Sequence, residues 1–131
     1  MAEAAQRRTK NRPNVFIHTA AVEAFPLNRS ECDVVLCHQV FPHFKDKAHV
    51  LNLFSHALKP EGKCIIFHFI NFVEINDWHR KAGTAVEQDI MPDEDAMRVL
   101  FARTGLSVLF IQDDNDGYFL SARLTRKDDD Q

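Results

Sequence analysis

The stretch CDVVLCHQVFPHFKDKAHVLNLFSHALKPEGKCIIFHF, residues 32–69, decides the fold. Residues 32–39 form a mainly apolar run of strand length, a pattern typical of a strand covered on both faces. Residues 46–59 carry apolar side chains at three- and four-residue spacing behind Asp46, which can serve as N-cap, and this predicts an amphipathic helix. After a Pro-Glu-Gly turn, residues 63–69 are a second apolar run. Strand, helix and strand in this order predict a βαβ crossover with two parallel strands.

The flanking segments extend this pattern in both directions. The β-branched and aromatic residues 14–20 predict a short strand, and the Ala-rich, basic residues 1–13 predict a helix or an arm. Residues 92–105 begin with Pro and acidic residues and end with Gly, which indicates a helix. Residues 106–114 and 117–124 read as strands separated by turn residues, so we expect an antiparallel hairpin.

Length and composition limit the class of protein. The 131 residues, 45% of them hydrophobic, suffice for one domain with one core, and we expect residues 126–131 to be a disordered tail. A net charge of -3 argues against a nucleic-acid partner, and no apolar run is long enough for a membrane helix. The polar start lacks the apolar region of a signal peptide, and three cysteines form neither zinc spacing nor an even disulfide set. A soluble, cytoplasmic protein with reduced thiols is expected.

Three stretches together resemble the central and C-terminal parts of class I S-adenosylmethionine-dependent methyltransferases. They are VEAFPLNRSECDVVLCHQVFPHF (22–44), VLNLFSHALKPEGKCIIFHF (50–69) and GLSVLFIQDDNDGYFLSARL (105–124). Within them, ALKPEGKCII looks like the family's Pro-Gly turn before its fifth strand, with Gly62 as the second glycine. The resemblance implies an α/β, incomplete Rossmann-like sheet with parallel central strands and a C-terminal hairpin. It also implies S-adenosylmethionine as the cofactor and a small molecule as the methyl acceptor.

Several of the family's cofactor-binding features do not appear in these residues. The family's first strand ends in a Gly-rich turn, but the glycines Gly62, Gly83, Gly105 and Gly117 form no such turn. Residues 1–11 resemble the helix after the family's second strand, so the first strand, first helix and second strand are expected to be missing. We therefore expect a truncated methyltransferase that is inactive as an isolated chain. The alternative is a non-catalytic, methyltransferase-derived binding or assembly module.

The resemblance places the cofactor-binding residues at two strand ends. Ala21 matches the position where family members often carry an Asp that accepts from the adenine amino group, and Val22 follows it. Cys37 and His38 end the strand over residues 32–39, where open α/β sheets place their ligand crevice. Ala21, Val22, Cys37 and His38 are thus expected to border the cofactor.

The substrate pocket is expected on the same side of the sheet. His43 follows the first apolar strand, His68 and Asn71 leave the second, and Trp78 and His79 come from the segment beyond it. Packing alternatives stay open: His43 can cap the next helix, His68 can be a satisfied core group, and Trp78 can fill the core. A metal site is not predicted, because the histidines match no metal-binding spacing.

Two further expectations concern mobility and partners. Residues 70–91 form either a substrate lid hinged at Gly83 or a fixed helix. In the complete family fold, two strands separate the strand matching residues 14–20 from that matching residues 32–39. An exposed strand edge favours pairing. We therefore expect residues 14–20 to move against residues 32–39, or a homodimer, or pairing with a missing N-terminal half.

Overall fold

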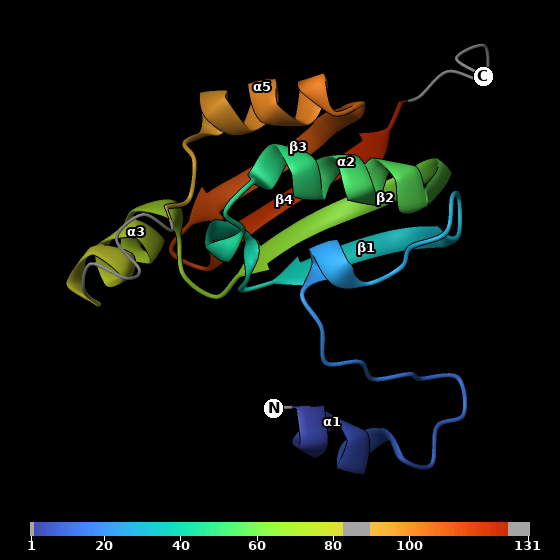
Figure 1. Ribbon diagram of the computed structural model, residues 1–131. Coiled ribbons are helices and arrows are strands. Elements are labelled where there is room, and N and C mark those ends of the chain that lie inside the picture. Colours follow the sequence, from blue (N-terminus) through green and yellow to red (C-terminus); the bar gives the residue numbers. More distant parts are fainter. Residues whose placement is uncertain (1, 83–89, 126–131) are drawn as a thin grey trace.

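The computed structural model describes residues 2–82 and 90–125, so the predicted tail and hinge Gly83 lie outside it. Helices and one mixed sheet make up this part of the chain (Figure 1). In chain order the elements are α1 (Ala2–Thr9), η1 (Val22–Ala24), β1 (Cys32–His38), η2 (Phe41–His43), α2 (Lys47–Ala57), β2 (Leu58–His68), α3 (Phe72–Lys81), α5 (Glu94–Arg103), β3 (Leu106–Asp114) and β4 (Gly117–Leu124).

The sheet has the strand order β1-β2-β4-β3. β1 pairs parallel with β2, which confirms the predicted crossover through α2. β4 pairs antiparallel with both β2 and β3, so the predicted hairpin extends the sheet as expected. His38 lies opposite Phe67 on β2, and His68 lies opposite Tyr118 on β4. This register brings the ends of β1 and β2 together at the edge of the sheet where α3 begins.

Two helices, α2 and α5, cover one face of the sheet (Figure 1). Each begins at an acidic N-cap: Asp46, the predicted cap, accepts a hydrogen bond from His49 N (3.0 Å), and Asp93 accepts one from Ala96 N (2.9 Å). The core lies between these helices and the sheet. Its largest fully buried side chains are Phe41, Phe101, Leu51, Leu58, Ile66, Met91, Met97, Leu106, Leu120, Leu124, Val50 and Pro42.

The opposite face of the sheet is not covered by any described helix. The prediction that β1 is covered on both faces is therefore wrong: Val34 and Leu36 are 53% and 60% exposed, while Cys37 points to the core. An aromatic row crosses this face from ring to ring, through His38, Phe69, Phe67, Phe119 and Phe110. We call it the aromatic face.

The predicted strand over residues 14–20 is also wrong. These residues take no strand conformation, and β1 is an edge strand of the described sheet. α1 is the expected helix, but it has no buried residue and lies apart from the sheet (Figure 1). A strand forms only where a neighbour completes its hydrogen bonds, and no described segment offers residues 14–20 such a neighbour.

The Pro-Glu-Gly turn lies inside β2 instead of before it. β2 begins at Leu58, directly after α2, and its register with β1 shifts between Cys32 and Val34. Glu61 has a φ of 69°, and a Cβ at Gly62 would lie 2.8 Å from the carbonyl oxygen of Lys59. The turn is therefore an irregularity that only glycine can complete at position 62.

Candidate functional site

Two cavities lie beside the carboxyl end of β1. The first cavity has a volume of about 510 Å³ and is bounded by η1, β1 and the segment from η2 to α2. Its walls are mainly apolar, with Glu23, His43 and Lys45 as the polar exceptions. The other lining residues are Ala20, Ala21, Val22, Val35, Leu36, Cys37, Val40, Phe44 and Phe54.

Three of the four residues expected at the cofactor share the first cavity. Ala21, Val22 and Cys37 line it, although η1 and β1 are apart in the sequence. His38 does not. Because successive strand residues point to opposite faces, the His38 ring lies on the aromatic face, 5.2 Å from the ring of Phe67 and 4.8 Å from that of Phe69. His38 thus lies on the other face of β1 from Cys37, and its expected contact with the cofactor stays a prediction.

The chemistry of the first cavity is that of a binding surface. Burial raises the pKa of the Cys37 thiol to about 12, so the thiol stays protonated and is a poor nucleophile. Ala21 presents a methyl group where a carboxylate would accept a hydrogen bond. The cavity fits the flat, apolar part of a nucleoside cofactor. Of the polar contacts that such a cofactor needs, only Glu23, two residues after Ala21, offers a carboxylate here.

The second cavity, with a volume of about 280 Å³, lies between the ends of β1 and β2 and the helix α3. It is slightly below the roughly 300–1,000 Å³ typical of small-molecule pockets. Four of the five residues expected at the substrate line it: His43, His68, Trp78 and His79. The remaining lining residues are Gln39, Ile70 and Ile75.

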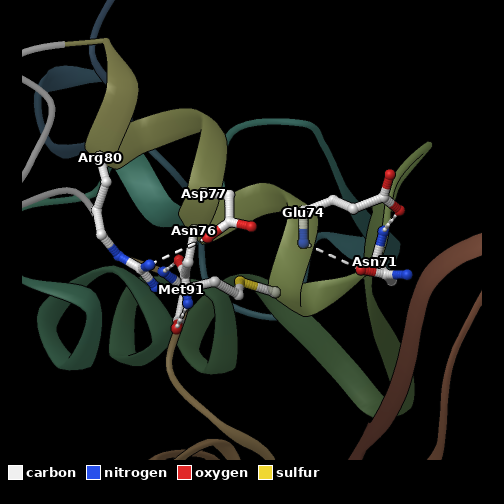
Figure 2. Close-up of polar contacts among 6 residues, drawn as sticks. All are labelled: Asn71, Glu74, Asn76, Asp77, Arg80 and Met91. Carbon is white, nitrogen blue, oxygen red and sulfur yellow. Dashed lines mark hydrogen bonds and ion pairs between the residues drawn. The ribbon is translucent and has the colours of Figure 1, made fainter.

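Asn71, the fifth expected residue, has another role. Its side chain caps α3 by accepting a hydrogen bond from Glu74 N (3.0 Å), and Glu74 Oε1 accepts one from Asn71 N (3.4 Å) (Figure 2). Asn71 does not line the second cavity. Capping fixes where α3 begins, and helical spacing then places Ile75, Trp78 and His79 on one face, toward the cavity.

Hydrogen bonds attach α3 to the segment that leads into α5. The Asn76 amide donates to the carbonyl oxygen of Met91 (3.0 Å) and accepts from Met91 N (2.8 Å), and both residues are buried (Figure 2). At the other end of the helix, Phe72 N donates to Asp113 Oδ1 on β3 (2.8 Å). These bonds favour the fixed helix over the lid for residues 72–81, and Trp78, 67% exposed, does not fill the core.

Imidazole rings dominate the second cavity. His68 is 5% exposed, and its Nε2 has no hydrogen-bond partner among the residues described. Burial and, to a smaller extent, the nearby His38, His79 and His43 together lower the pKa of His68 to about 4. The rings of His43 and His79 lie 5.0 Å apart, and the buried Nδ1 of His79 likewise has no partner within the described part of the chain.

Gln39 is a site residue that sequence reasoning missed. It has a φ of 62°, a left-handed conformation that is uncommon for residues other than glycine. Its N–H donates to the carbonyl oxygen of Phe67 (2.9 Å), and its Oε1 accepts from Phe69 N (2.9 Å). These bonds tie the end of β1 to the end of β2 beside the second cavity. A single glutamine outside any recognised motif gives no indication in the sequence of such a turn.

The described residues show neither a metal cluster nor a membrane helix. Within residues 2–82 and 90–125, no three His, Cys, Asp or Glu side chains are grouped so that they could hold a metal ion. Among the helices of the same residues, none is long and apolar enough to cross a membrane.

Comparisons with known proteins indicate what the chain is similar to. A family model described as a methyltransferase domain matches residues 1–66, which is half of the 131 residues. No curated protein matches the sequence. Solved structures match it over nearly its whole length. A chain from the complex of the Haloferax volcanii Trm112 methyltransferase activator with a putative methyltransferase has a TM-score of 0.77 and 16% identity, and the match covers 97% of this chain and 68% of that one.

Two further structures give similar values. The match to a SAM-dependent methyltransferase from Aquifex aeolicus has a TM-score of 0.69 and 14% identity, and covers 94% of this chain and 63% of that one. The match to a possible histamine N-methyltransferase from Thermotoga maritima has a TM-score of 0.69 and 19% identity, and covers 97% and 69%. The chain thus spans less than two thirds of the Aquifex protein. These similarities confirm the predicted α/β, Rossmann-like fold.

Proposed function

The chain belongs to the methyltransferase domain family, and on that premise we propose that it takes part in transferring a methyl group from S-adenosylmethionine to a small molecule. In this proposal the cofactor contacts the first cavity and the methyl acceptor occupies the second cavity. The three free cysteines support a reducing compartment, so the proposal includes a cytoplasmic location.

One observation carries this proposal: His43 lines both cavities. Methyl transfer is a displacement in which donor and acceptor must be held next to each other and in line. Two separate cavities that share one wall residue allow two different molecules to bind side by side. The cavity lined by four of the predicted acceptor residues adjoins the one lined by Ala21, Val22 and Cys37. This adjacency supports the proposal in addition to family membership.

The residues that would hold the cofactor are those of the first cavity. Val22, Cys37 and Phe44 offer apolar contacts to a flat ring, and Glu23 offers a carboxylate. When bound, S-adenosylmethionine supplies an electrophilic methyl group. The residues of the chain contribute binding, orientation and the exclusion of water. Since the methyl side chain of Ala21 cannot accept a hydrogen bond and no Gly-rich turn is present in the sequence, we propose that the isolated 131 residues bind the cofactor weakly and are inactive.

The test is calorimetry of the whole chain with S-adenosylhomocysteine, first alone and then fused behind a segment that contains a glycine-rich turn and a ribose-binding acid. We expect weak or undetectable heat for the chain alone and micromolar binding for the fusion. Ala21→Trp in the fusion should fill the first cavity and abolish binding. Ala24→Trp is the matched control, because Ala24 is exposed in the same η1 and does not line the cavity. Equal binding by both variants would contradict the proposed cofactor position.

A second candidate function is a non-catalytic assembly module that forms a homodimer. The aromatic face and the exposed Val34 and Leu36 on the edge strand β1 favour it, because open strand edges and large apolar patches are sites of association. Light scattering with size exclusion distinguishes the outcomes. A dimer that Leu36→Glu converts to a monomer supports this candidate, with Val99→Glu on exposed α5 as the control. A chain that stays monomeric in solution but binds the added N-terminal segment supports the methyltransferase instead.

A further inference from the structure

The second cavity contains a buried polar atom that the proposed function leaves unexplained. His68 ends β2 on the core side of the sheet, is 5% exposed and lines the cavity. Its Nε2 is buried and has no partner in the described residues. Buried polar groups in native proteins are nearly always hydrogen-bonded, so an unpaired one beside a cavity indicates a ligand atom that belongs there.

A second unpaired nitrogen belongs to a lining residue from another element. The Nδ1 of His79 on α3 is buried without a partner among the described residues, and His79 lines the same cavity. β2 and α3 thus each bring one unsatisfied ring nitrogen to it. No grouping that could hold a metal ion is found in this part of the chain, and the O–H or N–H of an organic molecule can supply the missing hydrogen bond.

The surroundings of His68 restrict the charge of that group. The pKa of His68 lies at about 4, because burial and the nearby His38, His79 and His43 disfavour a positive charge there. At neutral pH the ring is therefore uncharged and offers an anion no partner of opposite charge. A cationic ligand would be disfavoured by the same burial and the same neighbouring imidazoles that disfavour a positive charge on His68. A neutral ligand is the one that the cavity admits without an electrostatic cost.

The remaining walls restrict its shape. Ile70, Ile75 and Trp78 give the cavity apolar sides, and its volume is about 280 Å³. Apolar walls with one or two placed polar groups are typical of pockets for small, largely apolar molecules. The aromatic side chain of Trp78 provides a flat surface against which a ring can pack.

We infer that the second cavity binds a small, neutral, ring-bearing molecule with one O–H or N–H group, and that this group donates its hydrogen bond to His68 Nε2. In this arrangement His68 carries its own proton on Nδ1. The inference rests on the proposed function in one respect: the molecule bound in the second cavity is taken to be the methyl acceptor. His68 selects and positions that acceptor.

The test uses phenol as the probe, without cofactor, so that it does not depend on methyl transfer. The methyl resonances of Ile70 and Ile75 are followed by NMR during titration of the whole chain. We expect phenol to bind about tenfold more tightly than toluene, which has the same ring but no donor and leaves Nε2 unpaired. Benzoate and benzylammonium, the charged counterparts, should bind more weakly than phenol.

Variants of His68 separate recognition from folding. His68→Phe should reduce phenol binding to the level of toluene, and His68→Gln, which keeps an acceptor near the position of Nε2, should restore the preference. His56→Phe on exposed α2 is the matched control and should leave the preference unchanged. Unfolding temperatures show that each variant is folded.

Three outcomes would overturn the inference. They are equal binding of phenol and toluene, tighter binding of benzoate than of phenol, and an undiminished phenol preference in folded His68→Phe. Failure of the proposed function is seen separately, as absence of cofactor binding in the fused protein. Phenol recognition without cofactor binding would leave the site assignment in place and remove only its catalytic context.

Discussion

Asn76 and Met91 are joined by two hydrogen bonds, one in each direction, between a buried side-chain amide and a buried stretch of backbone. The pairing satisfies a backbone N–H and C=O that lie outside any helix or strand. It also fixes the position of α3, whose next residues form the wall of the second cavity. The cavity therefore depends on a contact that none of its lining residues makes.

Replacing Asn76 should destabilise the protein strongly. Asn76→Ala leaves the N–H and C=O of Met91 buried without partners, and each such group costs about 1–3 kcal/mol, so we expect a loss of roughly 2–6 kcal/mol in the free energy of unfolding. Urea denaturation measures it. Asp77→Asn, which weakens the exposed Arg80 ion pair on the same helix, is the control and should cost less than about 0.5 kcal/mol. A similar loss in both variants would contradict the role of Asn76.

Two glycines with positive φ should differ in their tolerance of alanine. A Cβ at Gly105 (φ 81°) meets no atom within 4 Å, so Gly105→Ala should cost only the conformational strain of about 1–2 kcal/mol. A Cβ at Gly117 (φ 129°) would lie 2.5 Å from the carbonyl oxygen of His68. Gly117→Ala should therefore cost about 2 kcal/mol more and disturb the end of β2. Equal losses in thermal unfolding would show that the backbone yields at Gly117.

The stability of the protein should decrease in acid through His68. Its pKa in the folded state is about 4, below the ordinary value of 6.5, so the unfolded state binds more protons between these two values. The contribution of His68 is thus fully present above pH 6.5 and is lost as the pH falls toward 4. His68→Gln should flatten this part of the stability profile, measured by urea denaturation from pH 7 to pH 4.5.

The three thiols should react in two groups. Burial raises the pKa of all three thiols, but Cys37 and Cys64 are buried in the core, whereas Cys32 is only half-buried. With a disulfide reagent at pH 8, Cys32 should react first and the other two only as the protein unfolds. Cys32→Ser should remove the early phase. An early phase that persists in this variant would mean that the core around β1 and β2 opens readily.

Local signals in the sequence predicted most of the fold. The Asp46 cap, the hairpin turn and the apolar runs each act within a few residues, and the structure confirms them. Burial of β1 on both faces and a strand over residues 14–20 were wrong because each depends on a neighbour. The apolar composition of a strand shows that both of its faces can be covered. Whether another helix or strand packs on the second face depends on residues elsewhere in the chain.

The same distinction holds for the candidate site. His43, His68, Trp78 and His79 were predicted together because all follow strand ends at one edge of the sheet, and they line one cavity. Strand alternation turns His38 away from Cys37, so His38 does not line the first cavity. Asn71 caps α3 and does not line this cavity, and its residue type alone does not distinguish a helix N-cap from a polar pocket residue. Gln39 could not be foreseen, since its left-handed backbone has no signature in a residue other than glycine.

Restoring a carboxylate at position 21 should strengthen cofactor binding. The family resemblance places at Ala21 an Asp that accepts from the adenine amino group, and Ala21 lines the first cavity. A charge-assisted hydrogen bond contributes about 1.5–3 kcal/mol, which corresponds to roughly 10- to 100-fold in affinity. Calorimetry with S-adenosylhomocysteine should therefore show tighter binding for Ala21→Asp in the fused protein. Ala24→Asp adds the same charge to η1 outside the cavity and should change little. Equal gains in both variants would mean that charge alone acts, and no gain in Ala21→Asp would place the adenine elsewhere.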